Sequence, residues 1–319
     1  MGSITRRNTI TGIGAATLAA ATLSPARQSS AAARTGKVAV SGGNVTYWIV
    51  GEGRGVPILM VHGGPGGTHD YMMPLAALGK DRPVVFWDQL DCGESDHPHK
   101  SGNWTIERYV SEIDSVRDAL GLTELHLLGS SYGGLFAAEY AARRPKGLKS
   151  CILAGPSISF PQEIEDQTYL VKLLPEDAAN AILKNEAADT IRQNETYDRA
   201  MQVFLHRHMC RANPWPADLQ ATFKVYNSDV ANAMTGSYRT RVAGSVGTYD
   251  GSSKLGEINV PTLLTYGEFD LLLGGTMCGY HHMIAGSHLY RTKDGSHLPW
   301  LEFAEDYNNA VAAFLVPLG

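Results

Sequence analysis

Short apolar runs alternate with amphipathic segments along most of this 319-residue chain. Three of the runs, PILMV, PVVFW and LHLLG, contain almost no polar residue, which is typical of strands buried on both faces of a sheet. The segment TIERYVSEIDSVRDALGL lies between the second and third runs, has helical spacing, and begins with Thr105 as a candidate N-cap. This order predicts an α/β fold with a mostly parallel central sheet and helices on both faces.

The pattern changes near the start and in the middle of the chain. From Lys37, two alternating runs about a Gly-Gly turn predict a leading antiparallel hairpin. Between residues 157 and 250, amphipathic helical segments follow one another without strands, which predicts an inserted helical lid. The core would then comprise residues 36–156 and 251–319, and end with two further strands and a closing helix.

Residues 1–35 differ in composition from the remainder. They contain four arginines and no acid, so the remaining chain has 23 basic and 32 acidic residues, a balance that argues against nucleic-acid or anionic-membrane partners. The pair Arg6 and Arg7, the small apolar run 10–23 and the triplet Ala31-Ala32-Ala33 predict a twin-arginine-type export signal, hence a periplasmic or extracellular protein. Thr9 replaces the usual bulky residue, and the alternative is a disordered leader on a cytoplasmic protein. The run is too short for a stable membrane span.

The four cysteines are far apart in the chain. They form no CxxC or Cys/His spacing, so no metal site is predicted, and no cofactor either. Disulfides stay open, because four cysteines allow three pairings. The cysteines are Cys92, Cys151, Cys210 and Cys278.

The stretch LHLLGSSYGG joins a predicted strand to a predicted helix through a G-x-S-x-G pattern with Ser131 at its centre. Such a tight turn needs glycine on both sides, and it lifts the hydroxyl to a helix N-terminus, where developing negative charge is favoured. We therefore predict Ser131 as a nucleophile. A glycine-rich turn without chemistry is the alternative.

A serine nucleophile needs a base and an acid, which in this strand-turn-helix context follow in the order Ser, acid, His. Asp270 ends one predicted strand and His297 follows the last one, so both fall at carboxyl ends of strands, where the crevice of an open sheet lies. Glu268 and Asp294 are rival acids.

The oxyanion of such a reaction needs backbone donors. The motif HGGPG at residues 62–66 directly follows the first buried run. We predict the N–H groups of Gly64 and Tyr132 as this pair, with Gly63 as the competitor of Gly64. His62 is predicted to hold the loop by hydrogen bonds.

The motifs HGGPGG, FWDQLDCGESD, GSSYGG, RHMCRANPWP, VPTLLTYGEFD and DGSHLPWLE occur in one order. Because of these motifs and their order, the chain from Lys37 to its end closely resembles the proline iminopeptidase group of α/β-hydrolases (peptidase family S33). The resemblance implies an α/β-hydrolase fold, the triad Ser131, Asp270 and His297, and cleavage of an N-terminal residue, often proline, from a short peptide or small amide. Relatives in the group act as amidases and esterases.

Two departures from the group concern the substrate. Its aminopeptidases typically hold the substrate amine with two glutamates, but here Arg239 and Leu271 align with them. An ammonium near Arg239 would be repelled by on the order of a few kcal/mol. The departures favour an esterase, lactonase or amidase for a substrate without a free amine. In the alternative, Arg239 faces solvent and another acid binds the amine, with three candidates: Glu163, Glu165 and Asp166.

A third departure lies in WDQLD, where Leu90 and Asp91 replace the usual arginine and glycine, so the support beneath the site is expected to be rearranged. Aromatic side chains are candidates for the acyl pocket, with core packing as the alternative for each. They are Trp215, Tyr132, Trp87 and Phe160. A ligand-binding relative without turnover is the remaining reading, which an intact triad disfavours.

Overall fold

The computed structural model describes residues 34–241 and 243–319. The predicted export signal lies outside these residues, apart from its last two positions, which belong to the first strand. Among the helices of the described residues, none is both long enough and apolar enough to cross a bilayer. All four cysteines are free, and only Cys278 has appreciable exposure.

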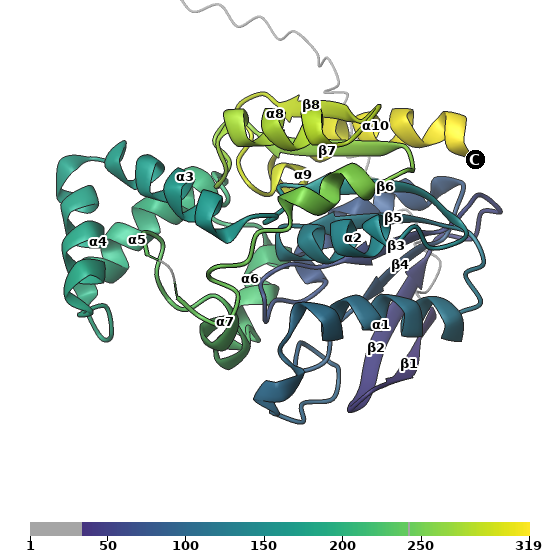
Figure 1. Ribbon diagram of the computed structural model, residues 1–319, viewed down its shortest axis with the longest axis horizontal. Helices are drawn as coiled ribbons and strands as arrows, with labels where there is room; N and C mark the ends of the chain where they lie inside the picture. The colour runs from purple at the N-terminus through teal and green to yellow at the C-terminus, as the bar shows by residue number, and fades with distance from the viewer. Residues whose placement is uncertain (1–33, 242) are drawn as a thin grey trace, which may run out of the picture. The chain divides into compact units, whose positions relative to one another are not determined.

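Eight strands of the described chain form one sheet in the order β1-β2-β4-β3-β5-β6-β7-β8 (Figure 1). β1 pairs antiparallel with β2 and β2 antiparallel with β4, whereas all other neighbours are parallel. The predicted hairpin and parallel sheet are therefore confirmed, with the hairpin starting at Arg34. The strands are β1 Arg34–Val40, β2 Gly43–Val50, β3 Ile58–Val61, β4 Val84–Trp87, β5 Leu125–Ser130, β6 Leu148–Ala154, β7 Thr262–Gly267 and β8 His288–Thr292.

Alternate residues of the central strands face two separate cores. Leu59 and Leu127 join the cluster beneath α1, α2 and α8, while Ile58 and Leu128 join the cluster beneath η1 and α10. The helices of the first face are α1 Ile106–Ala119, α2 Tyr132–Ala142 and α8 Gly274–Met283, near the 3₁₀ helix η3 Ser252–Glu257. Those of the second are the 3₁₀ helix η1 Asp70–Lys80, α9 Pro299–Glu302 and α10 Ala304–Leu315. Two short 3₁₀ helices, η2 Ser101–Asn103 and η4 Val316–Leu318, complete the set. Thr105 caps α1 as predicted, because its hydroxyl accepts the Arg108 N–H.

Between β6 and η3, the described residues form five α-helices, which gather to one side of the sheet, in teal and green in Figure 1. They are α3 Phe160–Lys172, α4 Glu176–Ala188, α5 Glu195–His208, α6 Ala217–Lys224 and α7 Ser228–Met234. The first three share an apolar cluster that includes Val171, Ile182 and Phe204, and Leu271 of the core joins it. The two ends of this inserted segment meet in a bridge between Ser159 and Asp250.

Candidate active site

Ser131 occupies a strained turn between β5 and α2. Its φ of 56° and ψ of −120° are unusual for a residue with a side chain and cost roughly 1–3 kcal/mol. The turn is held because the Ser131 N–H donates to the Ala154 carbonyl at 2.8 Å. Glycine is required on either side, since a Cβ at Gly133 would overlap the Val61 carbonyl and one at Gly129 would overlap the backbone of Gly133. Packing thus explains the G-x-S-x-G spacing.

His297 and Asp270 form a buried pair. The Nδ1 atom of His297 lies 2.6 Å from Oδ1 of Asp270, and their side chains are 4% and 0% exposed. The carboxylate also accepts the N–H groups of Leu271 at 2.7 Å and Gly267 at 3.1 Å. Because the carboxylate accepts, we assign the proton of the neutral imidazole to Nδ1, which leaves the lone pair on Nε2. This Nε2 is buried and makes no hydrogen bond.

The rival acids lie elsewhere. Glu268 and Asp294 are both exposed, and the Glu268 carboxylate accepts the Asp294 N–H at 3.1 Å. Neither forms a hydrogen bond or ion pair with His297 among the described residues. The structure therefore brings the histidine together with Asp270.

A cavity of about 330 Å³ opens at this edge of the sheet. Ser131 and His297 both line it, without a hydrogen bond between the hydroxyl and Nε2. The parallel strands place these groups together because their carboxyl ends meet at one edge. Inserted helices close the opposite side with residues from α3, α5, α6 and α7.

The HGGPG loop forms another part of the cavity lining. The Gly63 N–H donates to the Tyr71 hydroxyl at 2.7 Å, whereas the Gly64 N–H has no acceptor in the described part of the chain. His62 accepts the Gln89 N–H on Nε2 at 3.0 Å and donates from Nδ1 to the Gly63 carbonyl at 2.9 Å. The predicted structural role of His62 is thus confirmed, and burial lowers its pKa.

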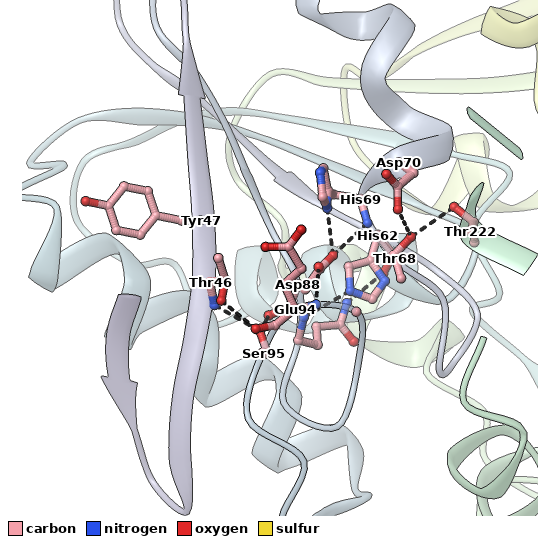
Figure 2. A network of polar contacts seen from close by, with 12 residues as sticks. Thr46, Tyr47, His62, Thr68, His69, Asp70, Asp88, Glu94, Ser95 and Thr222 are labelled. Atoms are coloured by element: carbon pink, nitrogen blue, oxygen red, sulfur yellow. Dashed lines mark hydrogen bonds and ion pairs between the residues drawn. The ribbon is translucent and has the colours of Figure 1, made fainter. Parts of the chain in front are cut away.

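A polar network extends behind this loop (Figure 2). Asp88 accepts both the backbone N–H and the Nδ1–H of His69 at 2.8 Å. Burial opposes protonation of His69, but the Asp88 bond and charge outweigh it and raise the pKa of His69. Thr68 bonds to Asp70 at 2.6 Å and to Thr222 of α6 at 3.0 Å. The loop that carries Gly64 is therefore tied both to the core and to an inserted helix.

Glu163 of α3 is one of the residues that line the cavity. Its Oε1 accepts the Gln167 side-chain amide at 2.7 Å, while its Oε2 is inaccessible to solvent and has no hydrogen-bond partner. Burial raises the pKa of Glu163, and the Ser157 side chain and the nearby charges of Arg239 and His297 partly oppose this. Of the three acids considered from the sequence, this is the one that lines the cavity.

The other two acids have different surroundings. Glu165 is exposed, and Asp166 is buried with its Oδ2 accepting the Leu273 N–H at 2.9 Å. Asp166 thereby joins α3 to the loop that follows Asp270.

Arg239 also lines the cavity and is partly exposed. Its backbone N–H donates to the buried Glu186 carboxylate at 2.9 Å, and Thr240 donates its N–H to the same group at 2.8 Å. Arg241 lines the cavity beside it. The cavity therefore combines one acid with two guanidinium groups.

The predicted aromatic pocket is only partly right. Tyr132 and Phe160 line the cavity, as does Leu271. Trp87 does not, because it is fully buried between the sheet and the helices. Trp215 does not line the cavity either, because its indole N–H donates to the Cys210 carbonyl and its ring stacks on Phe223. Phe223 reaches the cavity instead, together with Tyr71 and Tyr226, which sequence reasoning missed.

The altered WDQLD segment has its own support. Leu90 is buried in the core, and Asp91 accepts the indole N–H of Trp104 at 2.8 Å. The buried Glu112 pairs with Arg108 at 2.7 Å, and burial raises the pKa of Glu112 to about 8. The Trp104 indole and the Arg108–Glu112 pair thus support this segment.

Comparison with known proteins agrees with this architecture. Residues 56–303 match the family model described as the alpha/beta hydrolase fold. A proline iminopeptidase of Heyndrickxia coagulans is 35% identical over 282 residues, which cover 88% of this chain and 98% of that protein.

Two solved structures are similarly close. The crystal structure of VinJ matches with a TM-score of 0.84 and 32% identity, covering 90% of this chain and 99% of that one. A proline iminopeptidase of Mycobacterium smegmatis matches with a TM-score of 0.83 and 29% identity, covering 89% and 98%. From the motifs, the fold and these relatives together, the chain belongs to the proline iminopeptidase group of the α/β-hydrolase family.

Proposed function

We propose that this hydrolase cleaves an amide or ester through an acyl-enzyme on Ser131, and that it releases an N-terminal residue, often proline, from a short peptide or amide. The observation that carries the mechanism is the 2.6 Å bond from His297 to Asp270 at a cavity that Ser131 lines. This bond leaves the imidazole lone pair on Nε2, which has no hydrogen-bond partner.

In the first step, the Ser131 oxygen attacks the substrate carbonyl carbon while His297 Nε2 takes the hydroxyl proton. Asp270 stabilises the resulting imidazolium without taking the proton. The carbonyl oxygen becomes an oxyanion, for which Gly64 and Tyr132 are the proposed N–H donors. Gly63 is the weaker candidate, because its N–H already donates to Tyr71.

Collapse of this intermediate breaks the bond to the leaving amine or alcohol, which receives the proton from His297. Water then attacks the acyl-enzyme, with His297 again acting as base, and Ser131 is regenerated. No step requires a cofactor.

The proposed anchor for a substrate ammonium is Glu163. Glu163 lines the cavity that holds Ser131, and its Oε2 is buried without a hydrogen-bond partner, so a substrate ammonium would supply the missing donor. The position differs from those of the two replaced glutamates, so the chain would bind the amine from α3. Because burial raises the pKa of Glu163, this binding should weaken as the pH falls through that raised value.

A second candidate function rests on Arg239. Its guanidinium lines the same cavity, and Leu271 supplies no charge where the group pattern has an acid. These residues support an esterase, lactonase or amidase for a neutral or carboxylate-bearing substrate, since a guanidinium binds carboxylates in a bidentate manner.

The test compares hydrolysis of proline naphthylamide, its N-acetylated counterpart and a short-chain nitrophenyl ester. If Glu163 binds the ammonium, Glu163→Gln should lower kcat/KM for the free-amine substrate by about 10²-fold. The ester, which has no amine, should change less than about threefold. Glu165→Gln is the matched control, because that acid is exposed two residues away and should alter neither substrate.

Turnover of the ester or acetylated amide with no reaction of the free amine would favour the second function. In that case Arg239→Gln should reduce activity on carboxylate-bearing esters. An equal loss on every substrate in Glu163→Gln would instead indicate a structural role for the glutamate.

We also propose export of the protein, on the arginine pair Arg6 and Arg7 and the small apolar run that follows. Arg6→Lys with Arg7→Lys should leave the protein in the cytoplasmic fraction. An unchanged distribution between fractions would contradict the proposal.

A further inference from the structure

The loop that follows β4 gathers three potential metal ligands outside the cavity. Asp91, His97 and His99 each offer one ligand atom, and these atoms all lie within 4.8 Å of one another. Two imidazole nitrogens and one carboxylate oxygen are ligands that first-row divalent transition ions accept.

Asp91 is held in place by its surroundings. The residue is fully buried, its Oδ1 accepts the His99 N–H at 2.8 Å, and its Oδ2 accepts the Trp104 indole N–H at 2.8 Å. Each carboxylate oxygen has a second lone pair, so these bonds leave capacity for a cation. Outer contacts of this kind orient metal ligands in known sites.

The two histidines are exposed, so their side chains can adjust. Ligand atoms around a tetrahedral zinc ion lie roughly 3.4 Å apart, which the imidazoles can reach with a shift of about 1–1.5 Å. Nε2 of His97 lies 3.0 Å from the Gly93 carbonyl. When Nε2–H donates there, Nδ1 carries the lone pair that a metal needs.

We propose that Asp91, His97 and His99 bind a divalent transition-metal ion such as Zn²⁺ or Ni²⁺, with water completing the coordination. The Asp91 carbonyl accepts the Asn227 side-chain amide at 2.8 Å, and the Asn227 N–H donates to Gly66 at 2.8 Å. The ion would thus stabilise a loop that contacts Asn227 at the start of α7, and Asn227 in turn contacts the HGGPG loop. No metal was predicted from the cysteine spacings because this site contains no cysteine.

The test is calorimetric titration of the tag-free protein with Zn²⁺ and with Ni²⁺, beside Mg²⁺. We expect one saturable site for the two transition ions and none for Mg²⁺, which prefers oxygen ligands. His97→Ala and His99→Asn should each weaken binding at least tenfold. Asparagine suits position 99 because the backbone there has a φ of 51°.

The variant His281→Ala with His282→Ala is the matched control. It removes an adjacent histidine pair on α8 whose ring centroids are 5.5 Å apart and which has no place in the cluster. Its affinity should equal that of the unmodified protein, and transition ions should raise the melting temperature of both. Absence of saturable binding, unchanged affinity in His97→Ala, or loss of binding in the α8 variant would each overturn the proposal.

Discussion

Two regions line the cavity, the loops at the carboxyl ends of the core strands and the segment inserted between β6 and β7, and they are held differently. In the core loops, the contacts are local in sequence, since Asp270 accepts the N–H groups of Gly267 and Leu271 besides bonding to the His297 ring. In the inserted segment, the contacts join distant residues, since Glu186 of α4 accepts the N–H groups of Arg239 and Thr240.

This difference indicates a division of roles. Groups fixed by contacts with their immediate neighbours in the chain keep the sub-ångström geometry that bond-breaking requires. Groups held by contacts between distant residues of the inserted segment can change without disturbing the strands. Changes in the core loops should therefore affect all substrates alike, whereas changes in the inserted segment should affect some substrates more than others.

The largest effect is expected from Ser131→Ala. Loss of the proposed nucleophile should reduce kcat/KM about 10³-fold or more for amide and ester alike, and it should abolish labelling by a fluorophosphonate probe. Ser130→Ala is the control, because the neighbouring hydroxyl is fully buried and does not line the cavity. Labelling that persists in Ser131→Ala would rule out the proposed acyl-enzyme.

The next largest effect is expected from Asp270→Asn, which should reduce kcat/KM roughly 10³-fold on every substrate. The amide would no longer hold the imidazole in the tautomer that leaves Nε2 free. Glu268→Gln and Asp294→Asn should each remain within about threefold of the unmodified enzyme, since both acids are exposed. A greater loss of activity in either variant would indicate that the substituted acid, rather than Asp270, orients His297.

A smaller and selective effect is expected from Glu186→Gln. The buried carboxylate accepts bonds from Tyr197, Arg239 and Thr240, and charge-assisted bonds of this type contribute about 1.5–3 kcal/mol. Weakening them should loosen the segment around Arg239 and change the ratio of amide to ester kcat/KM by roughly tenfold. The exposed Glu176→Gln is the control. Equal losses of kcat/KM for amide and ester in Glu186→Gln would contradict the proposed division of roles.

The sequence predicts the core loops better than it predicts the inserted segment. The sheet, the hairpin and the positions of Ser131, Asp270 and His297 followed from motifs, because apolar strand runs and glycine-dependent turns act over a few residues. The G-x-S-x-G pattern is an example, since each glycine avoids a specific backbone overlap.

The substrate-facing residues of the inserted helices were harder to predict. Glu163, Glu165 and Asp166 lie within one turn of α3, and only the helix orientation determines which acid faces the cavity. Residue type alone predicts Trp215 in the pocket, whereas its indole bonds to the Cys210 carbonyl and the residue does not line the cavity. Helix packing brings these groups together across long sequence separations, which no local pattern encodes.

The smallest expected effect concerns stability at the His69–Asp88 pair, whose side chains are 11% and 1% exposed. Burial opposes the charged form of each residue, but their mutual bond and charge raise the pKa of His69 and lower that of Asp88. The charges of Asp70 and Glu94 also raise the pKa of His69. The nearby His62 also lowers the pKa of Asp88. A raised histidine pKa adds stability that is complete below the unfolded value of 6.5 and is lost as the pH rises through the folded value.

We therefore expect His69→Gln to lower the free energy of unfolding by about 1–2 kcal/mol near pH 6 and by less near pH 9, in urea titrations at both values. Asp88 stays charged across this window because its pKa is lowered. His282→Gln, at an exposed position, should leave the pH dependence unchanged. A constant difference between His69→Gln and the unmodified protein would mean that stacking on Trp48, at 3.8 Å between ring centroids, rather than the ion pair, stabilises this side of the HGGPG loop.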